Sequence, residues 1–130
     1  MIIGTGTDIV EISRIGRLLE AQAGERFIER VLTPEERKLA AVRKARLHEF
    51  VAGRFAAKEA VSKALGCGIG RQLGLQDMEI IPDAAGKPVC RISPAAWDRL
   101  GYEECQMLIH LSLSHSETTA VAFAVAENRE

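Results

Sequence analysis

The sequence predicts an α+β protein in which a mostly antiparallel sheet packs against a long helix. Three observations indicate this: a β-branched segment at residues 1–12, a helical pattern at 49–65, and two alternating segments at 107–114 and 119–126. Helices separate the first strand from the later hairpins, as is typical of α+β folds. The 130 residues contain no internal repeat and no Ser/Pro-rich linker, so we expect one domain over residues 1–130.

The N-terminal segment reads as a strand followed by two short helices. Residues 1–12 are expected to run as a strand into a loop, where Gly4 and Gly6 leave room for a ligand. Ser13 is the expected cap of a first helix that frays near Gly24. A second short helix would carry the apolar residues of 27–31.

A capping signal then opens a third helix. Thr33 precedes Pro34, and Glu36 follows three positions after the threonine, which predicts a capping box. The helix is expected to end in a basic cluster formed by Arg43, Lys44 and Arg46.

The helix over residues 49–65 has an unusual distribution of side chains. Phe55 falls opposite the small, apolar face, on the same side as Glu59 and Lys63. An ordinary surface helix does not place Phe on its polar side. We therefore expect two contact faces, one toward the core and one toward a partner or ligand. The core face comprises Phe50, Gly53, Ala57, Ala60, Val61 and Ala64.

The second half of the chain predicts a hairpin, a short helix and two final strands. Residues 78–81 and 89–92 flank a turn at 83–88, which indicates a hairpin. Ser93 and Pro94 begin a short helix that runs through Leu100. In the last strand, bulky residues alternate with alanines, giving one bulky face and one small face.

Composition excludes several functional classes. The formal net charge is −1 and 5% of residues are aromatic, which argues against a nucleic-acid-binding protein. No apolar run approaches the roughly 20 residues that cross a bilayer, and acidic Asp8 and Glu11 stand where a basic leader would be. We expect a cytoplasmic protein. Its three cysteines, without a C-x-x-C pair, are expected to be reduced and mostly buried.

Two carboxylates suggest a hard divalent cation. Asp8 lies where the first strand ends, and Glu59 lies on the long helix. Magnesium takes one or two protein carboxylates and completes its coordination with water and phosphate oxygens. The alternatives are a loop aspartate and an ion pair within the helix between Glu59 and Lys63.

The surroundings favour an anionic ligand. Arg54, Lys58 and Lys63 share one helix, and Arg71 lies in the glycine-rich stretch that follows it. Amides in such a loop can hold phosphate, although the same residues suit an ordinary helix C-terminus. His115 ends a strand, where it either bonds to backbone or contacts phosphate.

Three ordered motifs resemble those of the phosphopantetheinyl transferases. They read GTDIVEI at residues 6–12, GRFAAKEAVSKA at 53–64 and LSLSH at 111–115. Together with the chain length and Gly86-Lys87-Pro88, they resemble the short type of this family, the holo-[acyl-carrier-protein] synthases. The resemblance implies transfer of the 4′-phosphopantetheine arm of CoA to a serine of apo acyl carrier protein, with adenosine 3′,5′-bisphosphate released.

The resemblance also implies roles for individual residues. Asp8 and Glu59 would hold Mg²⁺, and Lys63 would contact the phosphate or leaving group. Asp8 is also a candidate acceptor for the serine proton. The nucleotide end of CoA would be surrounded by Arg54, Lys58, Gly66, Gly68, Gly70, Gly86, Lys87 and His115.

Members of the short type resemble one half of the longer, two-lobed transferases, which implies a homotrimer with CoA between subunits. It also implies that an acidic carrier docks on basic residues of the first helices, here Arg14, Arg17 and Arg26. Alternative functions are transfer to a polyketide or peptide synthetase carrier, a non-catalytic module that binds carrier or nucleotide, and an unrelated metal-dependent nucleotide hydrolase.

Overall fold

The computed structural model describes residues 1–43 and 46–130. Lys44, which belongs to the predicted basic cluster, lies outside these ranges. The elements run in the order β1 (Ile2–Glu11), α1 (Ile12–Glu20), α2 (Gly24–Val31), α3 (Pro34–Ala41), α4 (Leu47–Ala64), η2 (Leu75–Asp77), β2 (Met78–Pro82), β3 (Pro88–Ile92), α5 (Pro94–Leu100), η3 (Glu104–Gln106), β4 (Met107–His115) and β5 (Thr119–Asn128).

The strands form two antiparallel units, which confirms the predicted α+β class. β1, β5 and β4 make a three-stranded sheet in that order, and β2 pairs with β3 in a separate hairpin. In the larger sheet, Ala122 of β5 lies opposite Asp8 on one side and Leu113 on the other. The two termini meet at one end of this sheet, where the Met1 amino group donates to the Asn128 carbonyl.

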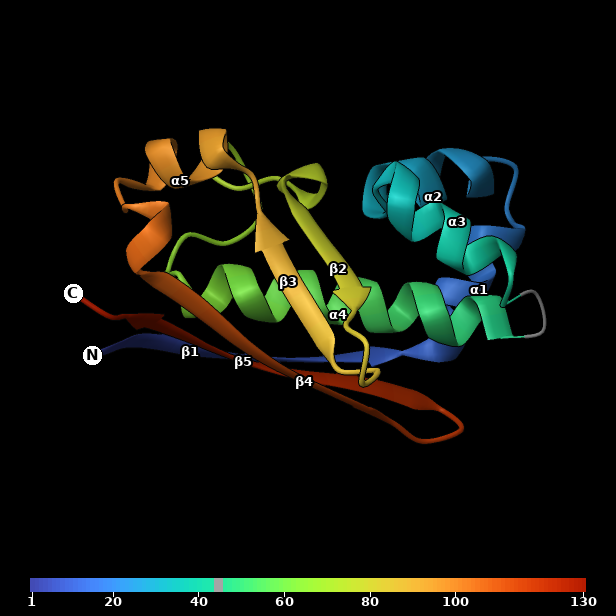
Figure 1. Cartoon of the computed structure of the whole chain (residues 1–130). Coiled ribbons are helices and arrows are strands. Elements are labelled where there is room, and N and C mark those ends of the chain that lie inside the picture. The colour runs from blue at the N-terminus through green and yellow to red at the C-terminus, as the bar shows by residue number, and fades with distance from the viewer. Residues whose placement is uncertain (44–45) are drawn as a thin grey trace.

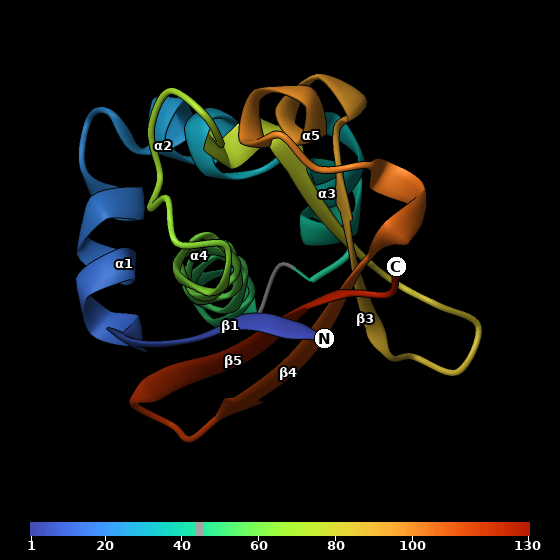
Figure 2. The same ribbon diagram turned by 90° about the vertical axis from the view of Figure 1, so that its left-hand side faces the viewer.

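Helix α4 runs through the middle of the molecule. Figure 1 shows the three-stranded sheet along one side of α4, and Figure 2, which views the helix end-on, shows α1, α2, α3, α5 and the hairpin around the rest. The helix is buried on nearly every side. The expectation of a second face reserved for a partner is therefore wrong for Phe55, whose ring packs on Phe27 of α2 at 6.3 Å.

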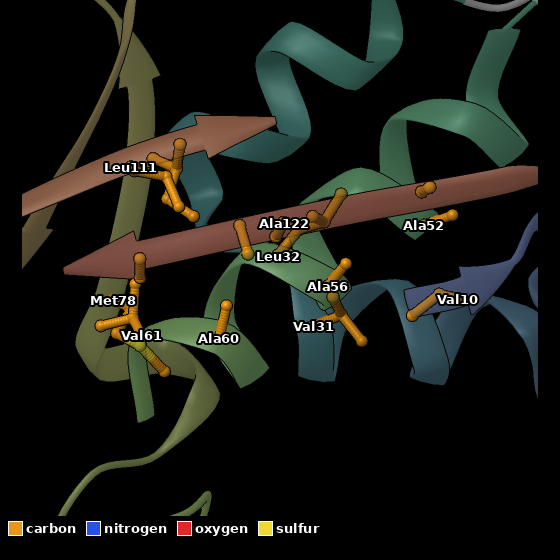
Figure 3. Packing of buried hydrophobic residues seen from close by; sticks show 14 of the residues in the cluster. Val10, Val31, Leu32, Ala52, Ala56, Ala60, Val61, Met78, Leu111 and Ala122 are labelled. Atoms are coloured by element: carbon orange, nitrogen blue, oxygen red, sulfur yellow. The ribbon is translucent and has the colours of Figure 1, made fainter. Parts of the chain in front are cut away.

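The small face of β5 is what allows the sheet to approach α4. Ala120, Ala122, Ala124 and Ala126 are buried against the helix, and Figure 3 shows Ala122 among the core side chains. The bulky face points outward, so Phe123 is 45% exposed. Ile9 is 70% exposed on β1, where it lies opposite Val121 of β5.

Local signals predicted most helix boundaries. The capping box is confirmed, because Thr33 Oγ1 accepts from the Glu36 amide and Glu36 Oε1 accepts from the Thr33 amide. The Ser13 cap is wrong: α1 begins at Ile12, with Glu11 as its extended N-cap. Gly24 begins α2 rather than lying in a frayed end of the first helix, and a Cβ at Gly24 would overlap the Leu19 carbonyl.

Within residues 1–43 and 46–130, no helix combines the length and the apolar character that crossing a membrane requires.

Candidate functional site

The close contact between β1 and α4 creates the first part of the site. A Cβ on Gly6 would overlap the Ala60 carbonyl oxygen, and one on Gly4 would overlap that of Ala64. The sequence analysis expected these glycines to leave room for a ligand. That expectation is wrong, because the backbone of α4 occupies the space. Because Gly4 and Gly6 have no side chains, β1 can approach α4 closely, and Asp8 further along the same strand lies beside Lys63.

Lys63 bridges the strand and the helix. Its Nζ donates to Oδ1 of Asp8 at 3.1 Å and to the Thr7 carbonyl at 3.0 Å. The Asp8 side chain is 17% exposed and that of Lys63 is 50% exposed. Among the described residues, Lys63 forms its ion pair with Asp8 of β1 and not with Glu59 of its own helix.

Glu59 completes a cluster of two carboxylates and one ammonium. Burial raises the pKa of Glu59, the negative charge of Asp8 raises it further, and the positive charge of Lys63 opposes both. Although 51 positions separate them, Asp8 and Glu59 therefore lie near enough for their charges to interact. Each carboxylate makes ionisation of the other less favourable, and a bound cation would relieve this repulsion.

This cluster fits Mg²⁺ better than a metal that demands a full set of protein ligands. In the described part of the chain, no group of three or more His, Cys, Asp or Glu side chains could hold a metal. Mg²⁺ binds through one or two carboxylates and takes its other ligands from water and phosphate. Asp8 and Glu59, repelling one another, supply that kind of oxygen pair.

A second, basic region lies between the start of α4 and the end of β4. An open hollow of about 820 Å³ is lined by residues that include Arg46, Glu49 and His115. An adjoining hollow of about 150 Å³ shares these three residues and adds Arg43 and Arg54. The sequence predicted a basic cluster that contains Arg43 and Arg46, but it assigned neither arginine to a binding site.

Arg54 is held rigidly at the wall of this region. Its Nε donates to the Ile80 carbonyl at 3.1 Å, and its guanidinium lies 4.4 Å from the centre of the Phe50 ring. Burial lowers the pKa of Arg54, and the Glu36 carboxylate opposes that shift. His115 Nδ1 lies 3.3 Å from the Ser116 carbonyl and 3.6 Å from Glu49 Oε1.

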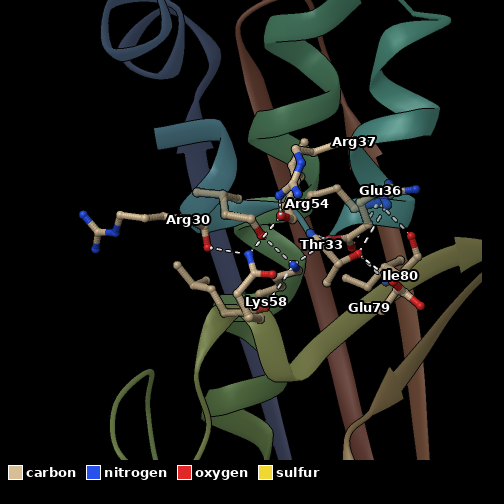
Figure 4. Close-up of polar contacts among 12 residues, drawn as sticks. Arg30, Thr33, Glu36, Arg37, Arg54, Lys58, Glu79 and Ile80 are labelled. Atoms are coloured by element: carbon tan, nitrogen blue, oxygen red, sulfur yellow. Dashed lines mark hydrogen bonds and ion pairs between the residues drawn. The ribbon is translucent and has the colours of Figure 1, made fainter. Parts of the chain in front are cut away.

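Lys58 does not face a ligand, which corrects the expectation that it contacts the nucleotide. Its side chain is 0% exposed, and Nζ donates to Glu36 Oε1 at 2.7 Å. The same ammonium donates to the carbonyls of Val31 at 2.6 Å and Leu75 at 3.0 Å. Burial lowers the pKa of Lys58, and Glu36 opposes this shift. Figure 4 shows this contact network, which uses all three N–H bonds.

The glycine-rich loop also differs from its expected role as a phosphate cradle. The amides of Gly66, Gly68 and Gly70 already donate to the carbonyls of Lys63, Ser62 and Leu73. Gly66 and Gly68 have φ values of 76° and 67°, so they end α4 in the conformation that glycine favours.

The hairpin tip carries the remaining predicted residues. Gly86, with φ 87°, forms the turn, and Lys87 projects at its exposed end. Lys87 lines a small hollow with His110 and Phe123 on the outer side of the larger sheet. It is therefore apart from the Asp8 cluster.

A sequence profile described as the 4′-phosphopantetheinyl transferase superfamily matches residues 4–125. The chain belongs to this superfamily. The holo-[acyl-carrier-protein] synthase of Bacillus cytotoxicus is 46% identical to it over 129 residues, covering 98% of each protein.

Solved structures from the same superfamily share the fold. A holo-(acyl-carrier-protein) synthase from Bacillus anthracis, in complex with CoA (3′,5′-ADP), is 45% identical with a TM-score of 0.83, and the match covers 98% of both chains. The holo-[acyl-carrier-protein] synthase of Neisseria meningitidis is 40% identical with a TM-score of 0.85, over 98% of this chain and 100% of that one.

In this phosphopantetheinyl transferase, the carboxylate cluster and the basic region lie at different edges of the larger sheet. Asp8 belongs to β1 and His115 to β4, which are the two outer strands. Two strand spacings amount to about 10 Å. A single chain therefore separates the two groups of predicted site residues rather than gathering them in one cleft.

Proposed function

We propose that this chain transfers the 4′-phosphopantetheine arm of CoA to a serine hydroxyl of an apo acyl carrier protein in a Mg²⁺-dependent reaction. One observation carries the proposal: Lys63 of α4 pairs with Asp8 of β1, and the charges of both act on Glu59 of α4. They come from two of the three motifs that resemble the transferase family.

The cluster supplies what transfer of this phosphoryl group needs. The serine oxygen bonds to the phosphorus that carries the pantetheine, the bond from that phosphorus to the bridging oxygen breaks, and adenosine 3′,5′-bisphosphate leaves. Asp8 and Glu59 would hold Mg²⁺, which when bound neutralises charge on the diphosphate. Lys63 adds a positive charge beside the leaving phosphate, and Asp8 is the first candidate acceptor for the serine proton.

The basic region suits the nucleotide end of CoA. Arg43, Arg46 and Arg54 line the two joined hollows with His115. Arginine binds phosphate through paired N–H donors, and the fixed Arg54 guanidinium loses little conformational freedom on binding. Of the predicted nucleotide contacts, this geometry favours Arg54 and His115.

We further propose a homotrimer in which each site is shared between subunits. The outer face of the larger sheet exposes Ile9 and Phe123, which supports burial against another copy of the chain. A neighbouring subunit would place its basic region, and the hairpin tip with Lys87, next to the Asp8 cluster. This arrangement would unite residues that one chain keeps apart.

The carrier would dock on α1 and α2. Arg14 and Arg17 are exposed along α1, and Arg26 is exposed on α2. Within the described ranges, no carboxylate lies at ion-pair distance from these three arginines. Glu20 and Glu25 dilute the positive charge of this surface, although Glu20 lies 3.6 Å from His48 on α4. An acidic carrier would be attracted to such a surface.

We place the activity in the cytoplasm, in fatty-acid synthesis. All three cysteines are unpaired thiols, as suits a reducing compartment. Burial raises the pKa of Cys90 to about 12, so that thiol is unreactive.

Mass spectrometry of the carrier tests the reaction directly. The protein would be incubated with CoA, Mg²⁺ and an apo acyl carrier protein. We expect the carrier to gain one phosphopantetheine on serine, and the gain to stop when EDTA removes the metal. An unmodified carrier, under conditions where an authentic transferase modifies it, contradicts the proposal. Parallel assays with polyketide and peptide synthetase carriers would identify the preferred partner.

A further inference from the structure

The C-terminus of α2 has all of its unpaired carbonyls satisfied by side chains from other elements. The last four carbonyls of a helix lack partners within the helix. Here these groups belong to Glu29, Arg30, Val31 and Leu32, because Ile28 already accepts from the Leu32 amide. Each of the four accepts a hydrogen bond from a side chain that lies outside α2.

Gln76 of η2 satisfies most of these carbonyls. Its Nε2 lies 2.8 Å from the Glu29 oxygen, 3.1 Å from that of Arg30 and 2.9 Å from that of Leu32. Gln76 itself is exposed, so it contributes these polar contacts without filling the core.

Two cations complete the arrangement. Lys58 Nζ donates to the Val31 carbonyl at 2.6 Å, and Arg37 Nη1 donates to the Leu32 carbonyl at 2.8 Å. Positive charge at a helix C-terminus is stabilising because it opposes the helix dipole. Glu36 balances the buried charge of Lys58, and Lys58 also holds the Leu75 carbonyl next to Gln76.

Apolar packing holds α2 less firmly than it holds α4. Of its eight residues, Gly24 and Val31 are buried, while Arg26 and Arg30 are exposed. Phe27 is partly buried against Phe55 of α4. The direction of so short a helix therefore depends strongly on how its C-terminal end is held.

We propose that Lys58, Gln76 and Arg37 form a clamp that positions α2 for the carrier protein. They are positioning residues: they touch neither CoA nor the reacting atoms, and they act by orienting Arg26. This inference rests on the proposed function, because it takes the α1–α2 surface as the docking site. It also gives the buried lysine of the K-E-A-x-x-K motif a role in carrier recognition.

Gln76 variants test the clamp, since the side chain is exposed. Gln76→Glu removes the donors and sets a negative charge against three carbonyls, whereas Gln76→Ala removes the donors alone. We expect KM for the carrier to rise about fivefold in Gln76→Ala and more in Gln76→Glu, the scale of a lost hydrogen-bonded contact. The KM for CoA and kcat at saturating carrier should stay within twofold of wild type. Gln72→Ala is the matched control, because Gln72 is also exposed and its amide contacts Arg99 at the limiting distance of 3.5 Å.

A double-mutant cycle separates positioning from simple loss of stability. Arg26→Ala should raise the carrier KM in the wild-type background and change it much less in Gln76→Glu, because a misdirected arginine no longer contributes. Hydrogen exchange gives a readout that needs no activity. Amides in the last turn of α2 should exchange at least tenfold faster in Gln76→Glu, with no change in α4.

The outcomes distinguish this inference from the proposed function. If the wild-type protein modifies no carrier, the proposed function fails, whatever hydrogen exchange shows. If the wild type is active and Gln76→Glu exchanges faster in α2 while carrier KM is unchanged, the clamp does not serve docking and the inference is overturned. Unchanged hydrogen exchange in Gln76→Glu overturns the clamp itself, and so does an additive cycle with Arg26→Ala.

Discussion

The Lys63 ammonium lies 3.1 Å from Oδ1 of Asp8, a residue 55 positions earlier on a different element. This ion pair joins the first strand to the central helix. It also sets the charge around Glu59, because Lys63 and Asp8 act on that carboxyl with opposite signs.

The carboxylate pair should be essential for turnover but not for folding. We expect Asp8→Asn and Glu59→Gln each to lower kcat by about 100-fold or more, as when one electrostatic contact to a developing charge is removed. Steady-state kinetics with saturating CoA and carrier would measure this, with size-exclusion chromatography to verify assembly. Glu35→Gln is a suitable control, since Glu35 is an exposed carboxylate paired with Lys38. A variant at Asp8 or Glu59 with near-normal kcat would remove that residue from the proposed role.

Titration of Glu59 should depend on both of its neighbours. In the metal-free protein its pKa is raised above the ordinary 4.5, first by burial and then by the charge of Asp8. Asp8→Asn should move this pKa down toward 4.5, whereas Lys63→Met should move it further up. Carbon-13 NMR of the labelled glutamate carboxyls would measure both shifts.

The same raised pKa predicts how Mg²⁺ binding depends on pH. Mg²⁺ needs the ionised carboxylate, so affinity should fall as the pH drops through the raised pKa, earlier than for an ordinary glutamate. Isothermal titration calorimetry over a pH series would measure this affinity. In the NMR titration described above, a Glu59 pKa that Asp8→Asn leaves unchanged would show that the two carboxylates do not interact.

Gly6→Ala should destabilise the protein, because its Cβ would overlap the Ala60 carbonyl. Forcing β1 away from α4 costs about 1–3 kcal/mol, as for other overpacked contacts, and urea denaturation would detect it. Gly70→Ala provides the control, since a Cβ at Gly70 meets no atom within 4 Å and Gly70 has no positive φ. Equal stability of the two variants would contradict the close approach seen at Gly6.

Phe123→Lys should disrupt the proposed trimer. A charge at this exposed position on the outer face of the sheet would have to be buried without a partner on assembly. Analytical ultracentrifugation should show dissociation, accompanied by loss of transferase activity. Leu18→Lys, at an exposed apolar position on α1, should keep the assembly of the wild type. Intact trimers of Phe123→Lys would exclude this face as the interface.

Local sequence signals accounted for much of the fold. The capping box at Thr33 and the alanine alternation in β5 depend on residues within a few positions of each other. The same holds for the turn at Gly86, whose amide donates to the nearby Asp83 carbonyl. Such interactions follow from backbone geometry and short-range pattern, which is why the sequence predicts them.

The site itself was predicted unevenly. Asp8, Glu59 and Lys63 were named from motifs; the structure pairs Lys63 with Asp8, and the charges of both act on Glu59. Lys58, one position before Glu59, was assigned to the nucleotide and is instead fully buried. Adjacent helical residues point about 100° apart. The sequence does not show which face of the helix will lie against a buried carboxylate of another helix.

What the sequence predicted unaided was a set of candidate reactive groups and the order of the elements around them. The long-range packing settled which of those groups remain accessible. Glu36, 22 positions from Lys58 and on a different helix, pairs with that lysine in the core and leaves it no exposed surface. The physical reason is that a buried charge or N–H group must find a partner wherever the fold supplies one, and partners this distant leave no local pattern.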